Sequence, residues 1–488
     1  MANQLTLGDL VLALSDRPAP ELTVPVQPII DSRDAAPKQG GPLSVFFAFV
    51  GEHVDGHNYV SDAFERGAVA VVVARDVALE GEGTVLDLRP GAMAPQSWVT
   101  PLVIIVPDVL AALQRAARWW RRRLSTRVIG ITGSVGKTTT KEIVARVLSE
   151  RYRVAWSRGS YNNEIGLPLT LLGLTSDVAY AVLEMGMYVR GDIRFLASIA
   201  TPDVGVVTNV EIVHAERAGT IDDIALAKRE LVEALPRGPE GVAILNDDDP
   251  RVKEMADHTQ ARVFRYGLSP SADLWADKID SLGLEGIRVT LHHGAEVQQV
   301  QVPLLGRHSV YALLRGAAVG LVEGLTWDEI CRGLQAPVTR LRLVAVPGIK
   351  GSTILDDTYN SSPPSALAAL ALLEDLKGRK VAVLGDMLEL GPYERKGHLE
   401  IGCRAAEVVS ELVVVGELGH LFAEGARRCG LSTEAIHSVR DSEQAAALLP
   451  SLIQRDDVIL VKGSRGVKME RIVSALKAEP APNRSVVD

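Results

Sequence analysis

The sequence predicts an α/β protein of three domains, and three observations support this fold class. The chain has 488 residues, several times the ~100–200 residues of an ordinary domain. Short runs of Val and Ile alternate with stretches of helical periodicity, which favours parallel sheets covered by helices over an all-β sandwich. Apolar residues make up 47% of the chain and charged residues 23%, a balance that is typical of folded globular proteins.

Composition also argues against several classes of protein. The 52 basic and 61 acidic residues give a net charge of −9, which offers no electrostatic attraction to nucleic acid. Cys331, Cys403 and Cys429 have no CxxC spacing, so we expect neither a disulfide framework nor a zinc site. The N-terminus lacks the pattern of a signal peptide, and no apolar run approaches the ~18–20 residues that span a bilayer. We therefore expect a soluble, cytoplasmic protein with no membrane insertion.

The first domain is expected to span residues 1–106 as a small α/β unit. Apolar runs predict strands at Val45–Val50, Ala68–Val73 and Leu102–Val106, with a short helix at Asp62–Arg66. Residues 81–100 contain Gly, Pro and Met without clear periodicity, and we expect a loop there.

The second domain is expected to span residues 107–337 as a doubly wound sheet. Asp108 is typical of a helix cap, and the following helix, Val109–Leu124, contains Arg121-Arg122-Arg123 near its end. We interpret these arginines as solvated cations at a helix C-terminus rather than as phosphate ligands. The alternation continues with strands at Val128–Ile131, Tyr180–Glu184, Val204–Thr208 and Val242–Asn246, helices at Thr138–Ser149 and Val310–Glu323, and a β-rich stretch at residues 263–302.

The third domain is expected to span residues 338–488 as a second doubly wound, Rossmann-like unit. Its predicted strands are Ser352–Leu355, Lys380–Leu384, Leu412–Val415 and Val458–Val461. Predicted helices lie between these strands, at Ser365–Leu376, His398–Val409 and Ser442–Ile453.

A phosphate-binding loop is the strongest functional signal. The strand at Val128–Ile131 leads into a glycine-containing turn, which leads into a helix; the loop residues are Gly133, Ser134, Val135, Gly136, Lys137, Thr138 and Thr139. Glycines let backbone N–H groups converge on phosphate, and the helix N-terminus adds a positive dipole end. Lys137 can reach the β- and γ-phosphate oxygens, and the Thr138 hydroxyl can ligate Mg²⁺. The spacing departs from G-x-x-x-x-G-K-[ST], because Ile131 stands where the first glycine is expected.

Glu184, His214 and Lys228 are further candidates. Glu184 ends an apolar strand and His214 lies just beyond the next one. Strand C-termini converge on the phosphate loop in a doubly wound sheet, so both side chains could hold Mg²⁺ there. A helix-capping glutamate and a surface histidine are the alternatives. For Lys228, the residues alone favour a solvated lysine on an amphipathic helix.

The phosphate loop, T-G-S-V-G-K-T, resembles that of the Mur ligase superfamily. Other segments resemble the same superfamily in order and spacing, so that the resemblance covers nearly the whole chain: Asp31-Ser32-Arg33, Phe46–Glu52, Asp55-Gly56-His57, Tyr161–Pro168, Glu184-Met185-Gly186, Thr208-Asn209-Val210, Ala227–Glu230, Gly306-Arg307-His308, Asp356–Asn360, Leu384–Gly391 and Lys462–Gly466. Several of these are weak alone, and their order makes the resemblance specific.

The resemblance implies a role for each domain and for individual residues. It implies an N-terminal UDP-substrate domain, a central P-loop domain for mononucleotide binding and a C-terminal Rossmann-like ligase domain. It places Lys137, Lys228 and His214 in catalysis, and it implies that Lys228 is carbamylated. Further implied roles are substrate binding by Ser32, Arg33, Asn162 and Asn163, metal binding by Thr138, Glu184, His214 and Lys228, and nucleotide binding by Arg340 and Asp357, besides the phosphate loop.

The activity implied by the resemblance is amide ligation. The segment Asp356–Asn360, continued by Ser-Ser-Pro, resembles the branch of the superfamily that adds D-Ala-D-Ala to UDP-MurNAc-tripeptide. That branch uses ATP and Mg²⁺, forms an acyl phosphate and then ADP, and serves peptidoglycan synthesis and thereby cell shape and division. The implied state is a monomer. One alternative is another ligase of the superfamily, either the type that adds diaminopimelate or lysine or the folylpolyglutamate synthase type. A second alternative is a P-loop NTPase without ligase activity.

Two departures concern the nucleotide base. The superfamily usually shows G-x-H-N-x-x-N where this chain has Gly306–Ala312, and its asparagines hydrogen-bond adenine. Ser309 and Ala312 stand at those positions here. Ser309 could make one hydrogen bond and the Ala312 side chain none. We therefore expect adenine selectivity to be weaker than phosphate binding.

Overall fold

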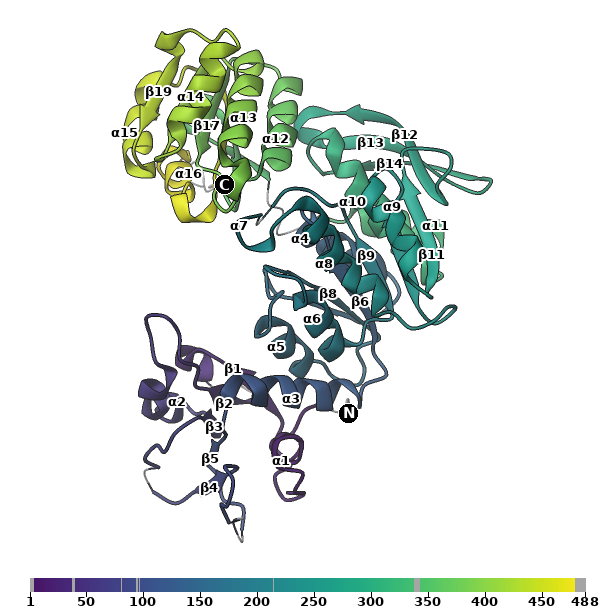
Figure 1. Ribbon diagram of the computed structural model, residues 1–488, viewed down its shortest axis with the longest axis vertical. Helices are drawn as coiled ribbons and strands as arrows, with labels where there is room; N and C mark the ends of the chain where they lie inside the picture. The colour runs from purple at the N-terminus through teal and green to yellow at the C-terminus, as the bar shows by residue number, and fades with distance from the viewer. Residues whose placement is uncertain are drawn as a thin grey trace, which may run out of the picture.

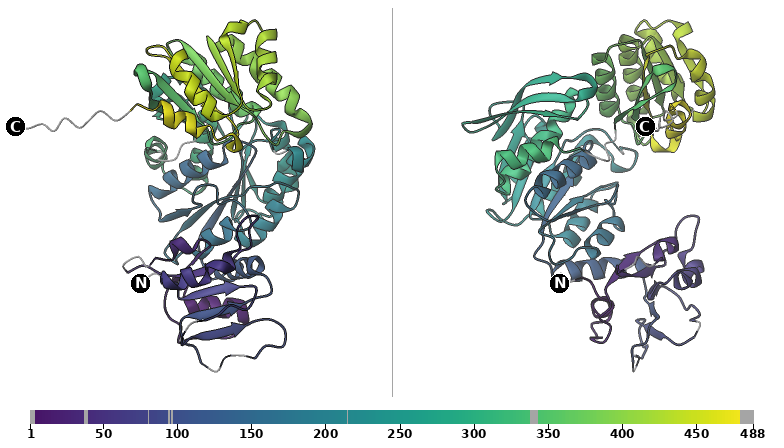
Figure 2. Two further views of the ribbon diagram at one scale, coloured as in Figure 1. Left: turned by 90° about the vertical axis from the view of Figure 1, so that its left-hand side faces the viewer. Right: turned by 180° about the vertical axis from the view of Figure 1, so that it is seen from behind.

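The computed structural model contains three sheets, one in each predicted domain range. It describes residues 4–36, 40–79, 81–93, 95, 97–213, 215–337 and 343–478. The N-terminal and C-terminal parts lie at opposite ends of the long axis, with the largest sheet between them (Figures 1 and 2). The α/β fold class is confirmed, whereas the domain boundaries at residues 106 and 337 stay predictions.

The N-terminal sheet has five parallel strands in the order β1-β2-β3-β5-β4. They are β1 (Val26–Ile29), β2 (Leu43–Phe47), β3 (Ala70–Val73), β4 (Thr84–Asp87) and β5 (Leu102–Ile105), accompanied by helices α1 (Leu7–Ser15) and α2 (Val60–Glu65). Strand β4 lies within residues 81–100, where the sequence predicted only a loop. Four residues carry too little periodicity to predict a strand, and β4 exists because it pairs with β5.

Helix α3 (Val109–Arg121) joins the first two domains. Asp108 caps it by accepting hydrogen bonds from two backbone N–H groups, as expected for this residue type. One cluster of buried side chains runs through α3 and includes Val45 of the N-terminal sheet and Leu183 of the central sheet. The prediction of solvated arginines is wrong for Arg121, which is buried and donates from Nε to the carbonyl of Ala200.

The central sheet has nine strands in the order β14-β13-β12-β11-β10-β9-β6-β8-β7, antiparallel only among β12, β13 and β14. The strands are β6 (Arg127–Thr132), β7 (Val154–Trp156), β8 (Tyr180–Glu184), β9 (Val204–Val207), β10 (Val242–Asn246), β11 (Arg262–Gly267), β12 (Leu274–Ser281), β13 (Ile287–His293) and β14 (Glu296–Val302). The continuous apolar runs of β8 and β10 are typical of parallel strands buried on both faces.

Helices cover both faces of this sheet, as predicted. One face packs against α4 (Lys137–Ser149), α10 (Val310–Val322) and α11 (Trp327–Gln335). The other face packs against α5 (Gly166–Leu172), α6 (Asp192–Ala200) and α8 (Ile221–Glu233). Two short helices, α7 (Ala215–Ala218) and α9 (Pro250–Glu254), follow β9 and β10.

The C-terminal sheet has six strands in the order β15-β16-β20-β17-β18-β19, with β15 antiparallel at one edge. They are β15 (Val344–Pro347), β16 (Thr353–Asp357), β17 (Lys380–Gly385), β18 (Glu411–Val415), β19 (Ile436–Val439) and β20 (Val458–Lys462). Its helices are α12 (Pro363–Asp375), α13 (Glu394–Val408), α14 (Gly419–Arg428), α15 (Ser442–Leu452) and α16 (Glu470–Leu476), which cover both faces. The pairing is the doubly wound arrangement that was predicted, with β15, β19, α14 and α16 in addition.

A disulfide joins Cys403 of α13 to Cys429 at the end of α14, with their Cα atoms 5.1 Å apart. The spacing of the cysteines did not predict it. The two residues are 26 positions apart, and only the packing of α13 against α14 brings them together. Cys331 is a free thiol.

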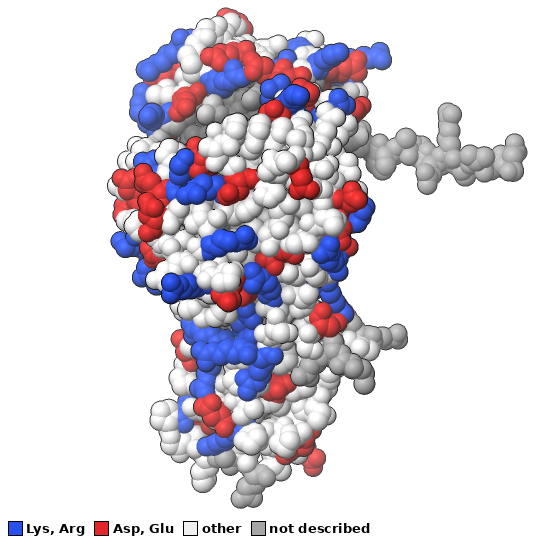
Figure 3. Space-filling model, turned by 90° about the vertical axis from the view of Figure 1, so that its right-hand side faces the viewer, with Lys and Arg blue, Asp and Glu red and all other residues white. Residues whose placement is uncertain are grey.

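On the face shown in Figure 3, acidic and basic side chains are interspersed, and a group of basic side chains lies at the junction of the N-terminal and central domains. Helix α3 crosses this junction with exposed Arg115, and exposed Arg122 and Arg123 follow its end. Among the helices of the described residues, none is long and apolar enough to cross a membrane.

Candidate active site

The phosphate loop connects the end of β6 to the start of α4. Gly133 has φ +143° and a Cβ at this position would overlap the Thr208 side chain, so only glycine fits. Gly136, at φ +84°, directly precedes α4. The backbone N–H of Val135 donates to Oδ1 of Asn209 at 2.9 Å, which fixes the middle of the loop to the end of β9.

Lys137 folds back over this loop. Its Nζ donates to the carbonyl oxygen of Gly133 at 2.8 Å and to that of Ser134 at 3.3 Å. The Ser134 hydroxyl in turn donates to the Glu211 carbonyl at 2.8 Å. The ammonium therefore lies at the loop, where the γ-phosphate of a nucleotide would need positive charge, while Thr138 and Thr139 occupy the first turn of α4.

Glu184 is the centre of a buried polar cluster. Its carboxylate accepts hydrogen bonds from the Thr138 hydroxyl and from Nδ2 of Asn162, both at 2.9 Å. Glu184 is fully buried, and no basic side chain of the described residues pairs with it. A buried carboxylate with only neutral partners fits a divalent cation, because Mg²⁺ prefers hard oxygen ligands and would neutralise the charge. His214, the other predicted ligand, lies outside the described residues.

Lys228 is buried on α8, at 2% exposure. Burial, aided by the positive charge of Lys137, holds the pKa of its amine well below the usual range. In the part of the chain that the structure describes, no acceptor or carboxylate pairs with this amine. The sequence-based expectation of a solvated lysine is therefore wrong, because the amine is buried and burial disfavours its charged form.

One cavity of about 380 Å³ brings five predicted residues together: Gly133, Lys137, Asn162, Asn163 and Lys228. Tyr188, Phe195 and Leu196 contribute an apolar wall. Asn163 lies in the turn before α5, where its Oδ1 accepts from the N–H of Gly166 at 2.9 Å. The cavity therefore combines a phosphate loop, amide groups and a buried amine with an apolar surface.

The predicted substrate residues of the N-terminal domain lie apart from this cavity. Ser32 and Arg33 follow β1, where Asp31 caps the turn. Ser32 is buried, whereas the Arg33 side chain is 79% exposed and pairs with Asp31 at 2.6 Å. This contact lowers the pKa of Asp31. Neither residue lines the cavity beside the phosphate loop.

Asp357 ends β16 in the C-terminal domain and is paired with a lysine. Its Oδ2 accepts from Nζ of Lys462 at 2.6 Å, and the same Nζ donates to the carbonyl of Asn360 at 2.9 Å. Burial lowers the pKa of His308, and the nearby Asp357 opposes this shift. The end of β16 therefore faces the segment that precedes α10. Arg340 lies outside the described residues.

Sequence reasoning missed the role of Lys462 as the partner of Asp357. A signal was present, because Lys462 ends an apolar strand just as Glu184 does. In a parallel sheet, polar residues at that position lie at the edge where ligands bind. The β16–β20 pairing places Asp357 directly beside Lys462, which no local pattern could reveal.

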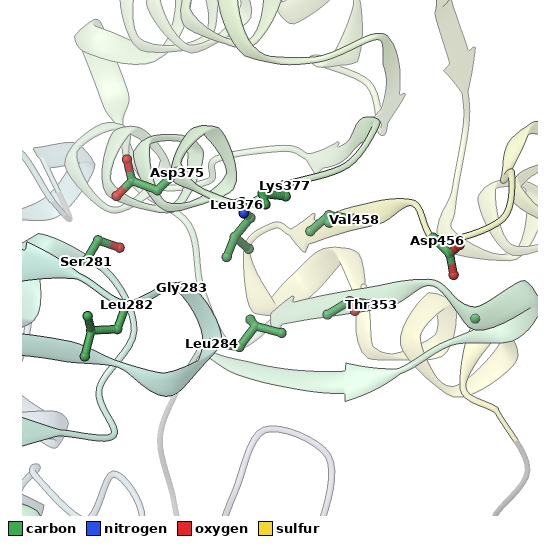
Figure 4. A pocket seen from close by; sticks show the side chains of 11 residues that line it. Ser281, Leu282, Gly283, Leu284, Thr353, Asp375, Leu376, Lys377, Asp456 and Val458 are labelled. Carbon is green, nitrogen blue, oxygen red and sulfur yellow. The ribbon is translucent and has the colours of Figure 1, made fainter.

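A larger cavity, of about 580 Å³, lies elsewhere. It opens between the turn after β12, with Leu282 and Leu284, and the C-terminal domain, with Thr353, Leu376 and Val458 (Figure 4). None of the predicted site residues lines it. We assign the active site to the smaller cavity, because charge and hydrogen-bonding chemistry converge there.

Family models match most of the central and C-terminal domains. The Mur ligase middle domain matches residues 131–320, and the Mur ligase glutamate ligase domain matches residues 339–465. The UDP-N-acetylmuramoyl-tripeptide–D-alanyl-D-alanine ligase of Bacillus subtilis is 36% identical over 440 residues, covering 89% of this chain and 91% of the relative.

Solved structures agree with these matches. MurF from Acinetobacter baumannii superposes with a TM-score of 0.82 at 28% identity, covering 97% of this chain and 98% of that structure. MurF ligase from Thermotoga maritima, determined in complex with ADP, has a TM-score of 0.75 at 26% identity, covering 92% and 96%.

Proposed function

The chain belongs to the Mur ligase family, and on that premise we propose that it is an ATP-dependent, ADP-forming ligase that joins D-alanyl-D-alanine to UDP-MurNAc-tripeptide. The observation that carries the proposal is the cavity in which Lys137 of the phosphate loop and the buried Lys228 meet. The Bacillus subtilis relative is named as a ligase of this kind, and the match to it and to the two MurF structures covers nearly their whole length.

The reaction would proceed in two displacements. The terminal carboxylate of the tripeptide attacks the γ-phosphorus of ATP, a P–O bond forms and ADP leaves. The amine of D-Ala-D-Ala then attacks the acyl phosphate, the amide bond forms, and phosphate and a proton leave. Lys137 would stabilise charge on the transferring phosphoryl group, and the apolar wall with Phe195 and Leu196 would limit access of water to the acyl phosphate.

Magnesium would be held at Glu184 and Thr138, with His214 as a further ligand. When bound, Mg²⁺ neutralises charge between ATP and the anionic acceptor. Asn162 would orient the Glu184 carboxylate through the hydrogen bond between them.

Lys228 would be carbamylated, and its burial and lowered pKa support this role. A neutral amine attacks CO₂, an N–C bond forms, one N–H proton leaves, and an anionic carbamate results. The depressed pKa of Lys228 supplies the neutral amine, and an anion at this position would suit a metal site better than an ammonium.

The remaining roles extend to the whole chain. Residues 1–106 would bind the UDP-sugar through Ser32 and Arg33, residues 107–337 would bind ATP, and residues 338–488 would present the dipeptide. Arg340 and Asp357 would contact the nucleotide from this third domain. As a monomeric cytoplasmic enzyme of peptidoglycan precursor synthesis, the protein would support cell wall biogenesis, cell shape and division.

The alternatives are not favoured. Ligases that add diaminopimelate, lysine or glutamate would share the family models, but the Bacillus subtilis relative, 36% identical to this chain, is named a D-alanyl-D-alanine ligase. An NTPase without ligase activity would leave the N-terminal domain without a role, whereas the match to the Acinetobacter MurF structure covers 97% of this chain.

The deciding experiment measures phosphate release from ATP with UDP-MurNAc-tripeptide and D-Ala-D-Ala added singly and together. Sustained turnover only with both substrates, together with the ligated pentapeptide product by mass spectrometry, is expected. Equal turnover without either substrate would identify an NTPase instead.

A further inference from the structure

The nucleotide site lacks the side-chain amides that the resemblance leads one to expect. The Ser309 hydroxyl donates to the carbonyl of Leu305 at 2.7 Å, so its proton is already used within the chain. Ala312 is 4% exposed and packs in the core of the central domain. The start of α10 therefore offers little to the edge of an adenine base.

Arg315 lies on the same face of α10, one turn beyond Ala312. It is 5% exposed, its Nε has no hydrogen-bond partner, and no carboxylate of the described residues forms an ion pair with it. A buried guanidinium without a counter-charge is costly unless a ligand supplies one. This arginine is therefore a candidate for ligand binding.

The Arg315 side chain ends beside the phosphate loop. Gly316 packs on Ile143 and Gly320 packs on Val147, so α10 and α4 run in the same direction with their N-termini at one end. Helical side chains lean toward the helix N-terminus. Accordingly, Nη2 of Arg315 lies 3.3 Å from the position that a Cβ of Gly136 would take.

The groups around Arg315 do not neutralise it. Its guanidinium carbon lies 5.9 Å from the centre of the Tyr266 ring. Burial raises the pKa of Tyr266 to about 12, against the opposing charge and hydrogen bond of Arg315, so this neighbour is a neutral hydroxyl rather than a counter-charge. The nearby Asp248 carboxylate accepts instead from the Tyr311 hydroxyl at 3.1 Å and from the N–H of Leu268 at 2.8 Å.

We propose that Arg315 binds the polyphosphate of the nucleotide next to Gly136. This contact supplies nucleotide affinity that Ser309 and Ala312, which stand in place of the expected asparagines, cannot supply. The proposal rests on the proposed function only in that the enzyme uses a nucleoside triphosphate. It makes the phosphates, rather than the base, the main determinant of nucleotide affinity. The enzyme should consequently accept other bases.

The first test measures binding of ADP and of pyrophosphate by calorimetry. Arg315→Met should weaken both by ~10-fold or more, as expected for a lost charged hydrogen bond, and Arg315→Lys should restore part of the affinity. The ligand-free Arg315→Met protein should melt at the same or a higher temperature, because an unpaired buried charge is removed. A structural arginine would instead lower the melting temperature and leave the ADP affinity unchanged.

Arg332→Met is the matched control, because Arg332 is an arginine on the neighbouring α11 that is paired with Glu150 at the surface. It should bind ADP as the unmodified enzyme does. If Arg315→Met keeps its ligase activity and binds both ADP and pyrophosphate as tightly as the unmodified enzyme does, the proposal is overturned. If the unmodified enzyme binds no nucleotide, it is the proposed function that fails.

The second test needs no change at Arg315 and therefore does not depend on the folding of that variant. The unmodified enzyme should use GTP in ligation with a kcat/KM within ~10-fold of that for ATP. Ala312→Asn should increase the preference for ATP by roughly 10-fold, because one well-placed contact to a base contributes about that much. Pyrophosphate should displace ADP, and adenosine should not. Strong displacement by adenosine, or a preference for ATP of more than ~100-fold, would show that the base dominates.

Discussion

At the scale of residues, buried ionisable side chains divide into those that have partners among the described residues and those that lack them there. Lys141 is fully buried and donates to the carbonyls of Ser157 and Gly159 at 2.8 Å. Glu184, Lys228 and Arg315 are also buried, yet among the described residues none has a charged partner. All three lie near the phosphate loop, where ATP, a metal ion and CO₂ would supply the missing partners.

Lys137→Ala should abolish turnover while leaving the protein folded. The ammonium that lies over the loop is lost, and we expect kcat to fall by at least ~10²-fold, as for other groups that stabilise transition-state charge. Phosphate release and circular dichroism measure the two effects. Lys253→Ala, at an exposed lysine paired with Asp247, is the control and should remain active. Nearly unchanged phosphate release from folded Lys137→Ala would remove this lysine from its role.

Lys228→Ala should be nearly inactive, because the carbamate anion is lost. Formate or acetate should restore part of the activity by placing a carboxylate in the vacated space, whereas methylamine should not. The ligase assay with each additive separates an anionic from a cationic role for this side chain. Rescue by the amine alone, or full activity without any additive, would contradict carbamylation.

At the scale of elements, α13 and α14 are held at unusually close approach. A Cβ on Gly425 would overlap the carbonyl of Leu399, and a Cβ on Gly402 would overlap that of Phe422. The disulfide between Cys403 and Cys429 links the same two helices. Glycines here serve packing rather than backbone conformation, because neither has a positive φ.

Gly425→Ala should destabilise the C-terminal domain by ~1–3 kcal/mol, the usual cost of overpacking a core. Urea unfolding followed by circular dichroism measures the change. Gly173→Ala, where the nearest atom to an added Cβ is 3.5 Å away, should change the free energy of unfolding by less than ~0.5 kcal/mol. Equal stability of the two variants would show that α13 and α14 can separate without cost.

At the scale of the whole molecule, the first two domains share a core and the third has its own. Buried residues on both sides of α3 belong to one cluster. The clusters of the C-terminal domain contain, within the described ranges, a single residue from the central domain, the partly buried Leu305. The N-terminal and central domains should therefore move as one body and the C-terminal domain as another.

We accordingly expect the ligand-free enzyme to be more open than the substrate-bound enzyme. Small-angle scattering should show a decrease in the radius of gyration when an ATP analogue and UDP-MurNAc-tripeptide are added together, because Asp357 and Arg340 must approach the nucleotide. Albumin in the same buffers controls for solvent contrast. Identical scattering profiles with and without the ligands would contradict closure.

The sequence by itself determined the elements whose signals are local. The apolar runs Tyr180–Glu184 and Val242–Asn246 are strands with the predicted bounds, because parallel strands buried on both faces must be continuously apolar. Asp108 predicted the start of α3. The phosphate loop was equally visible, since its glycines, Lys137 and Thr138 act through the backbone of one short segment.

Only the tertiary structure decided contacts between distant segments. Strand β4 exists through its pairing with β5, the disulfide through the packing of α13 on α14, and the Asp357–Lys462 pair through the register of β16 and β20. Likewise, Lys228 looked solvated and Arg315 carried no signal until packing buried both. The physical reason is that burial and pairing depend on how sheets and helices pack, whereas sequence periodicity reports only which side of its own element a residue occupies.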